Sequence, residues 1–283
     1  MATEALRGVQ TPTTAEPLRR EGPLRRNLTT TWMVAVRELI RLRRTPSRII
    51  SGLAQPLLFL FVLGAGLKNV VGQNAGAGFD YIQFLFPGIV AMSILTSGLM
   101  AAISIVWDRE WGFLREMLVA PVSRASLVLG KAIGGGSVAV VQGVLLVVVA
   151  PIIGVDLSVG SFFAMLGFLL LMAFALVSFG VVVAARMQRL ESFQMVMALV
   201  LQPMIFLSGA IFPVRRLPEW LGVIVRFNPA SYPVDAIRRI VLPGSPGLTI
   251  GGSLLPIWSE ALITLGFGLA MLTLAVRLFS HTD

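Results

Sequence analysis

The chain has 283 residues, of which 56% are hydrophobic and only 13% are charged, whereas a soluble domain carries about 25% charged residues. This composition leaves too little polar surface for a water-soluble globule and predicts a membrane protein. The chain has no cysteine, which excludes disulfides, thiolate catalysis and cysteine-based metal sites. The formal net charge is +9, but the basic residues lie mostly beside the ends of apolar runs. There they would meet lipid headgroups and set orientation, so we expect membrane lipids as partners and no nucleic acid.

The first 28 residues are polar and rich in Thr, Pro and Arg, without the apolar core of a signal peptide. We expect residues 1–28 to form a disordered cytoplasmic tail and residues 29–283 to form one transmembrane domain. An amphipathic helix should follow the tail, because Trp32 lies on an apolar face while Arg37, Arg41 and Arg44 share another. That pattern is typical of a helix lying flat in the inner membrane surface.

Six apolar runs, none with a charge in its middle, are long enough to cross a bilayer as helices, which takes about 20 residues. They lie at Ile49–Leu67, Phe84–Val106, Ala132–Gly154, Phe162–Ala185, Phe193–Phe212 and Leu254–Val276. The sequence therefore predicts an all-α polytopic membrane protein with six transmembrane helices.

The distribution of basic residues predicts the topology. The region before the first run is rich in arginine, and the linkers 107–131 and 186–192 and the tail after the sixth run also carry basic residues. By the positive-inside rule these segments face the cytoplasm, which places both termini inside. The linkers 68–83 and 155–161 are poor in basic residues and are expected to lie outside.

The linker after the second run contains a second amphipathic pattern. On a helical wheel Trp107, Trp111, Leu114 and Leu118 fall on one face of a helix that ends at Pro121. Two interpretations stand: the helix anchors the chain at the membrane interface, or it docks a cytosolic subunit.

The linker 213–253 should be external but carries five arginines. The stretches Pro218–Phe227 and Pro233–Leu242 are too short to span a bilayer. They are expected either to dip back between the fifth and sixth spans as re-entrant helices or to lie on the outer leaflet. In the first case Asp235 can pair with Arg238 or Arg239 at helical spacing.

Residues that would signal chemistry within the membrane are missing from the six runs. Their interiors offer no ionisable residue, with Glu260 near the external start of the sixth, which disfavours an intramembrane enzyme and ion-coupled transport. Lys131 follows Gly130, but Ala132 replaces the Ser or Thr that a phosphate loop needs. Gly130 and Gly134 instead form a small-residue spacing for close helix packing. We expect no catalytic residue and no metal site.

Several polar or soft side chains lie within the runs. The amides of Gln55, Gln142 and Gln202 should face other helices or a cavity, where they either bond between helices or contact a polar part of a substrate. Met92, Met195 and Phe206 either pack the core or line an adaptable surface. These six residues form the candidate substrate path.

Four stretches of the sequence resemble one known family. The stretch from Asp108 to Arg124, DREWGFLREMLVAPVSR, resembles the cytoplasmic loop of type-2 ABC transporter permeases, especially the daunorubicin/doxorubicin-resistance group. The stretches Phe206–Pro213, Leu217–Leu221 and Asn228–Arg238 match as well, and the likeness covers about residues 30–279. Trp111 departs from the pattern, since relatives often have a polar residue there, which bears on partner choice.

The resemblance implies a membrane subunit that pairs with a second permease and two cytosolic ATP-binding cassette ATPases. The permease itself would be no enzyme and bind no cofactor, because ATP and magnesium belong to the partner. By position, the coupling element would comprise Trp107, Glu110, Trp111, Gly112, Leu114, Arg115, Glu116, Leu118 and Pro121. The external re-entrant helices would include Pro218, Trp220, Asn228, Pro229, Tyr232, Asp235 and Arg238.

The expected activity is export of amphipathic, drug-like or lipid-like molecules across a prokaryotic plasma membrane. A lipid-linked glycan or another envelope lipid is an alternative cargo. A membrane anchor or assembly protein without a transport cycle is an alternative of a different class.

Overall fold

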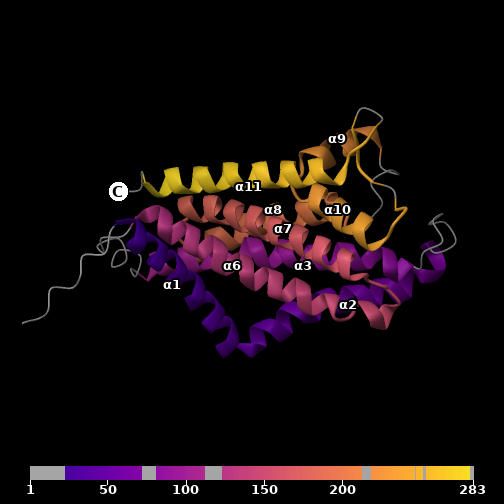
Figure 1. Cartoon of the computed structure of the whole chain (residues 1–283), viewed down its shortest axis with the longest axis horizontal. Coiled ribbons are helices and arrows are strands. Elements are labelled where there is room, and N and C mark those ends of the chain that lie inside the picture. Colours follow the sequence, from indigo (N-terminus) through magenta and orange to yellow (C-terminus); the bar gives the residue numbers. More distant parts are fainter. Residues whose placement is uncertain are drawn as a thin grey trace, which may run out of the picture.

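The computed structural model describes residues 23–71, 81–111, 123–211, 218–245, 247–250 and 253–280 (Figure 1). In chain order the elements are α1 (Pro23–Arg44), α2 (Pro46–Val71), α3 (Tyr81–Ala101), α4 (Ile103–Glu110), α6 (Arg124–Val147), the 3₁₀ helix η1 (Ala150–Ile153), α7 (Val159–Arg186), α8 (Leu190–Leu207), α9 (Glu219–Phe227), α10 (Ser231–Val241), β1 (Thr249–Ile250), β2 (Ser253–Leu254) and α11 (Ile257–Ser280). The strands β1 and β2 form a short antiparallel pair.

The expected six spans are confirmed: six helical stretches of the described chain are long and apolar enough to cross a membrane. Three form the centre of the bundle, because 72% of the Tyr81–Glu110 window and 67% of the windows in α6 and α7 are buried. In α2, α8 and α11 the buried share is only 17 to 22%. The structure is thus a tightly packed α3–α6–α7 core with three peripheral helices, each leaving an apolar face uncovered within this chain.

The two ends of the bundle differ. The start of α1, the start of α6 and the end of α11 lie at one end, where Figure 1 marks C, and α9, α10 and the strands lie at the other. We call the first the linker end, because α4 and α6 flank the 112–122 linker there, and the second the α10 end. Residues 112–122 themselves lie outside the described part of the chain.

Some expected span boundaries are wrong, for local reasons. The third span runs over Ala125–Val147, because Ser123 caps the start of α6 by accepting a hydrogen bond from the Ser126 amide. Pro151 and Gly154, with φ of 73°, turn the chain before the expected end. Gly209, with φ of 77°, follows the end of α8 at Leu207. The earlier start of α6 puts Lys131 inside the third span, which corrects the expectation of charge-free interiors.

The second and sixth spans are also displaced. The second continues from α3 through a turn at Ala102 into α4 and reaches Glu110. The sixth begins at Ile257, because Leu254 belongs to β2 and Pro256 precedes the helix.

The amphipathic helix before the first span is present as α1, and it begins at Pro23, inside the stretch 1–28 expected to be a tail. Thr29, Thr30 and Thr31 each donate to the carbonyl four residues earlier, which accommodates three threonines in a helix. The helix runs along the outside of α6 (Figure 1). Its contact face toward α6 includes Val34 and Ala35, whereas the expected apolar face around Trp32, 69% exposed, points away.

Close approach of α1 and α6 depends on two glycines, as their spacing predicted. A Cβ at Gly130 would lie 2.7 Å from the Cβ of Val34 and 2.8 Å from the Thr31 carbonyl oxygen. A Cβ at Gly134 would lie 3.0 Å from the Cα of Ala35. The Thr31 hydroxyl also donates to the Ser126 carbonyl at 3.1 Å. A side chain larger than hydrogen at either glycine would therefore push α1 away from α6 and break these contacts.

We predict that Gly130→Ala destabilises the protein by about 1–3 kcal/mol, because the added methyl overpacks the α1–α6 contact. The measurement is thermal unfolding in mild detergent. Gly167→Ala in α7 is the matched control, since nothing lies within 4 Å of a Cβ there, and it should keep or raise the midpoint because alanine favours a helix more than glycine does. Equal midpoints for both variants would contradict the close packing.

Candidate functional site

Three consecutive charges at the end of α4 point to different neighbours, because successive helical residues differ in direction by about 100°. The first, Asp108, accepts a hydrogen bond from Lys131 Nζ of α6 at 2.6 Å. The same Lys131 ammonium group donates to Ser104 Oγ at 3.0 Å. Arg37 Nη2 of α1 lies 3.5 Å from the same Asp108 oxygen. The Asp108 carboxylate therefore joins α4 to both α6 and α1.

The second charge, Arg109, caps the C-terminal end of α7. Its Nη1 donates to the carbonyls of Ala184, Ala185 and Met187 at 3.3, 3.0 and 2.7 Å. These carbonyls lie at the negative end of the α7 dipole, where a cation is favourable. The guanidinium also lies 6.0 Å from the centre of the Phe279 ring of α11.

The third charge, Glu110, caps the N-terminal end of α8. Its Oε2 accepts a hydrogen bond from the Leu190 amide at 3.1 Å. Arg189, the residue before α8, makes no capping bond with its side chain, so the cap comes from a different helix. Glu110 was expected to belong to the docking element, and within this chain its carboxylate already holds the start of α8.

The tryptophans of the expected coupling element face outward. Trp107 is 45% exposed and Trp111 is 85% exposed, at the point where the described part of α4 ends. On the far side of the linker, the Ser123 amide donates to Asn27 Oδ1 of α1 at 3.3 Å. The residues on both sides of the linker are thus bonded to other helices of the bundle. The remaining expected coupling residues, Gly112, Leu114, Arg115, Glu116, Leu118 and Pro121, lie outside the described residues.

At the α10 end, Arg238 forms a second buried anchor. Its Nη2 donates to the carbonyls of Gly209 and Ala210 at 2.7 and 3.0 Å, in the turn that follows α8. The guanidinium lies 4.3 Å from the centre of the Phe84 ring of α3, a cation–π contact. Burial lowers the pKa of Arg238 to about 10, and the charge of Asp235 opposes that fall. The side chain therefore remains a cation at neutral pH.

The start of α10 caps the end of α8. Asn228 Nδ2 donates to the Met204 carbonyl at 2.9 Å, and Ser231 Oγ donates to the Leu207 carbonyl at 3.0 Å. Tyr232 donates its hydroxyl to the Arg226 carbonyl at 2.6 Å, and burial raises the pKa of that phenol. Of the other residues expected here, Pro218 precedes α9, Pro229 lies in the turn before α10, and Trp220 is 65% exposed on α9.

An ion-pair network fastens α10 to α11. Arg239 Nη1 lies 3.5 Å from Asp235 and 3.1 Å from Glu260, and it donates to the Leu255 carbonyl at 2.7 Å. Asp235 also accepts from the Leu248 amide at 2.9 Å. Of the two pairings expected for Asp235, the structure forms the one with Arg239, four residues on, while Arg238 binds the turn after α8.

The candidate substrate-path residues fall into two groups. Gln142 and Met92 are buried; Ser97 Oγ of α3 donates to Gln142 Oε1, and Gly52 of α2 leaves the space that the Gln142 amide occupies. Gln142 thus bonds between helices, one of the two expected uses. Gln55 is exposed on α2, and Met195, Gln202 and Phe206 lie at helical spacing on the exposed face of α8.

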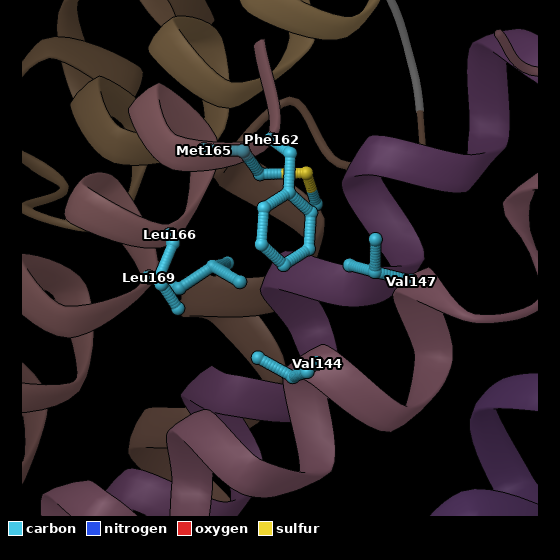
Figure 2. Close-up of a pocket in the computed structure, with 6 residues that line it drawn as sticks. All are labelled: Val144, Val147, Phe162, Met165, Leu166 and Leu169. Atoms are coloured by element: carbon cyan, nitrogen blue, oxygen red, sulfur yellow. The ribbon is translucent and has the colours of Figure 1, made fainter. Parts of the chain in front are cut away.

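An apolar hollow between α6 and α7 lies apart from this path (Figure 2). It is lined by Val144, Val147, Phe162, Met165, Leu166 and Leu169, and the side chains of Met165 and Phe162 lie next to each other (Figure 2). Among the described residues, no three His, Asp or Glu side chains come together where a metal ion could bind.

Comparison with known proteins decides the family. Residues 29–242 match the family described as ABC-2 type transporter. The chain belongs to the ABC-2 type transporter family. It is 30% identical over 214 residues to a putative transport permease, ycf38, of Cyanophora paradoxa, covering 73% of this chain and 72% of that protein. It is 35% identical over 208 residues to nodulation protein J of Rhizobium meliloti (strain 1021), covering 72% and 77%. ABC-2 membership makes this chain a transport permease of the membrane.

Sequence reasoning missed several residues that hold this ABC-2 chain together at the linker end. Ser104, Asp108 and Lys131 were not singled out as one site, and neither was Glu38, which is 8% exposed. A usable signal existed for Glu38, which shares a helical face with Ala35 and Leu42 at spacings of three and four. An acidic residue on the packing face of an amphipathic helix indicates cationic neighbours. Arg109 gave no such signal, because its partners are backbone carbonyls.

We predict that Arg238→Gln lowers the free energy of unfolding by about 2 kcal/mol or more, because two buried carbonyls lose a charged donor. Thermal unfolding of the purified protein measures the loss. Arg226→Gln on α9 is the control, since that side chain is exposed, and its midpoint should match wild type. An Arg238→Gln midpoint within the error of this control would contradict the anchoring role.

Proposed function

We propose that this chain is the permease subunit of an ATP-driven exporter, working with a second permease and two cytosolic ATP-binding cassette subunits. The partner subunits bind ATP and magnesium and hydrolyse ATP, and this chain transmits their movement to the membrane. Family membership supports a partner of this kind. The observation that carries the proposal is the junction at the linker end, where Asp108, Arg109 and Glu110 connect α4 to α1, α6, α7, α8 and α11.

The junction suits force transmission for a mechanical reason. A partner that grips the 112–122 linker would move the end of α4, and charge-assisted bonds at the partly buried Asp108 and Arg109 and at the exposed Glu110 link that end to its neighbours. The displacement would therefore reach five helices at once. Nucleotide binding at the partner supplies the differential free energy between two states, and the bundle carries it to the spans.

The basic residues at the linker end support one orientation of the chain in the membrane. The basic residues around α1, α4 and the end of α7 gather at the linker end, where the positive-inside rule places the cytoplasm. We place both termini on that side of a prokaryotic plasma membrane, with α9 and α10 outside. The exposed apolar face of α1 would lie in the inner leaflet, and α9 and α10 would form the external re-entrant hairpin.

The cargo is best described as amphipathic. The faces of α2 and α8 that this chain leaves uncovered combine apolar side chains, such as Met195 and Phe206, with the amides of Gln55 and Gln202. Facing a second permease, such surfaces would enclose a path for a drug-like or lipid-like molecule entering from the bilayer. A lipid-linked glycan or another envelope lipid would use the same amides for its polar head.

We predict that Trp111→Ala together with Arg115→Glu reduces both copurification of the ATPase subunit and its ATP hydrolysis, because both changes fall on the proposed docking element. Trp111, 85% exposed, is preferable to Glu110, whose loss would also release α8. The measurement is a pulldown in mild detergent with mass analysis, followed by the ATPase rate of the complex. Membrane insertion and thermal midpoint should stay unchanged.

Trp258→Ala is the control, since this tryptophan is 66% exposed at the α10 end. It should leave copurification and hydrolysis intact. If the linker variant binds and stimulates the ATPase like wild type, the docking role fails. If the wild-type chain captures no ATP-hydrolysing subunit, the alternative of a membrane anchor without a transport cycle gains support.

A further inference from the structure

Lys131 is a buried cation about two turns into α6. The residue is 7% exposed, and its ammonium group contacts two side chains of α4, Asp108 at 2.6 Å and Ser104 at 3.0 Å. Ser104 and Asp108 are four residues apart, so one face of α4 presents both oxygens to a single cation. A cation at this depth persists only with such partners, because an unpaired buried charge is strongly unfavourable.

The Asp108 carboxylate is shared with α1. Arg37 Nη2 lies 3.5 Å from Asp108 and 3.7 Å from Glu38 Oε1, and Arg41 lies 3.7 Å from the other oxygen of Glu38. Glu38 packs against Gly134 of α6. Three cations and two carboxylates thus alternate across α1, α4 and α6. Among the described residues, Asp108 is the one charged residue that α4 contributes to this cluster.

We propose that Lys131 and Asp108 are positioning residues for coupling: their ion pair makes α1 and α6 follow the coupling segment when the ATPase partner moves it. This inference rests on the proposed function and extends it to two residues outside the docking element. Arg109 and Glu110 connect α4 to the other side of the bundle, toward α7, α8 and α11. Among the described residues, Asp108 carries the charged contacts of the α4 junction with α6, through Lys131, and with α1, through Arg37.

Packing between α4 and α6 does not by itself require two opposite charges at this place. Apolar residues of similar volume often replace a buried ion pair without loss of stability, so stability by itself does not explain two charges here. An ion pair holds one defined geometry between its helices through charge and hydrogen bonding. If the pair positions α4, another cation at position 131 should keep what neutralising either charge removes.

The test uses the complex with its ATPase partner in lipid nanodiscs. The chain contains no cysteine, so spin labels can be placed at Met33→Cys on α1 and Val159→Cys at the far end of α7, both exposed. With the labels in one permease copy, double electron–electron resonance measures their distance without nucleotide and with ATP, magnesium and vanadate. The variants are Asp108→Asn, Lys131→Met and Lys131→Arg, the last of which keeps a cation beside Asp108 and leaves the carboxylate next to Arg37. Arg186→Met, which removes an exposed cation at the same end, is the control.

We expect the wild type, the Arg186→Met control and Lys131→Arg to show a nucleotide-dependent shift in distance. Both neutralised variants should lose the shift while still binding the ATPase and hydrolysing ATP. Shifts retained in both neutralised variants, or a Lys131→Arg variant without a shift, would overturn the inference and leave the proposed function standing. If neutralised variants fail to assemble, Ser104→Ala replaces them, and a reduced shift supports the inference whereas an unchanged shift overturns it. A wild-type complex without any shift or hydrolysis would instead overturn the proposed function.

Discussion

Charge-assisted contacts at the end of α4 are the constraint on which the rest of the structure depends. The apolar surfaces of α3, α6 and α7 bury one another, but in lipid such surfaces gain little from association, because the surrounding tails are equally apolar. Defined relative positions therefore need close contacts and polar bonds. Asp108 provides such bonds toward α6 and α1, Arg109 toward α7, and Glu110 toward α8. At the opposite end Arg238 and Arg239 do the same for α8, α10 and α11.

The contrast between central and peripheral helices follows from this arrangement. Polar bonds hold α8 at its two ends, by Glu110 at the start and by Asn228 and Ser231 at the finish, while its middle stays exposed. Helix α2 leaves at Gly52 the space that the Gln142 side chain occupies, and only 17% of its span window is buried. Helices fixed at their ends and uncovered between them are consistent with the second permease that we propose as a partner. They also suit a cargo path whose walls change when the ends move.

The sequence predicted the six spans because the length of an apolar run is a local property of the chain. The six spans, the amphipathic helix around Trp32 and the packing role of Gly130 and Gly134 came from such patterns. Span ends were harder, because hydropathy continues past Val147 and Leu207 while glycine and proline geometry turns the backbone. The junction was hardest: Lys131 meets Asp108 only after two helices pack, and Arg109 and Arg238 bind carbonyls that have no sequence signature. The expected docking role of Glu110 illustrates this, since its described contact is with the Leu190 amide within the same chain.

The account's central claim is that movement imposed on the linker reaches the helix ends through the charges of α4. The most direct measurement is hydrogen–deuterium exchange at the Leu190 amide, which donates to Glu110, in the reconstituted complex with and without ATP and vanadate. The account predicts that nucleotide trapping changes the exchange rate there, while amides in the middle of α7 keep theirs. Identical exchange at Leu190 in the two states, under conditions where the partner hydrolyses ATP, would contradict it.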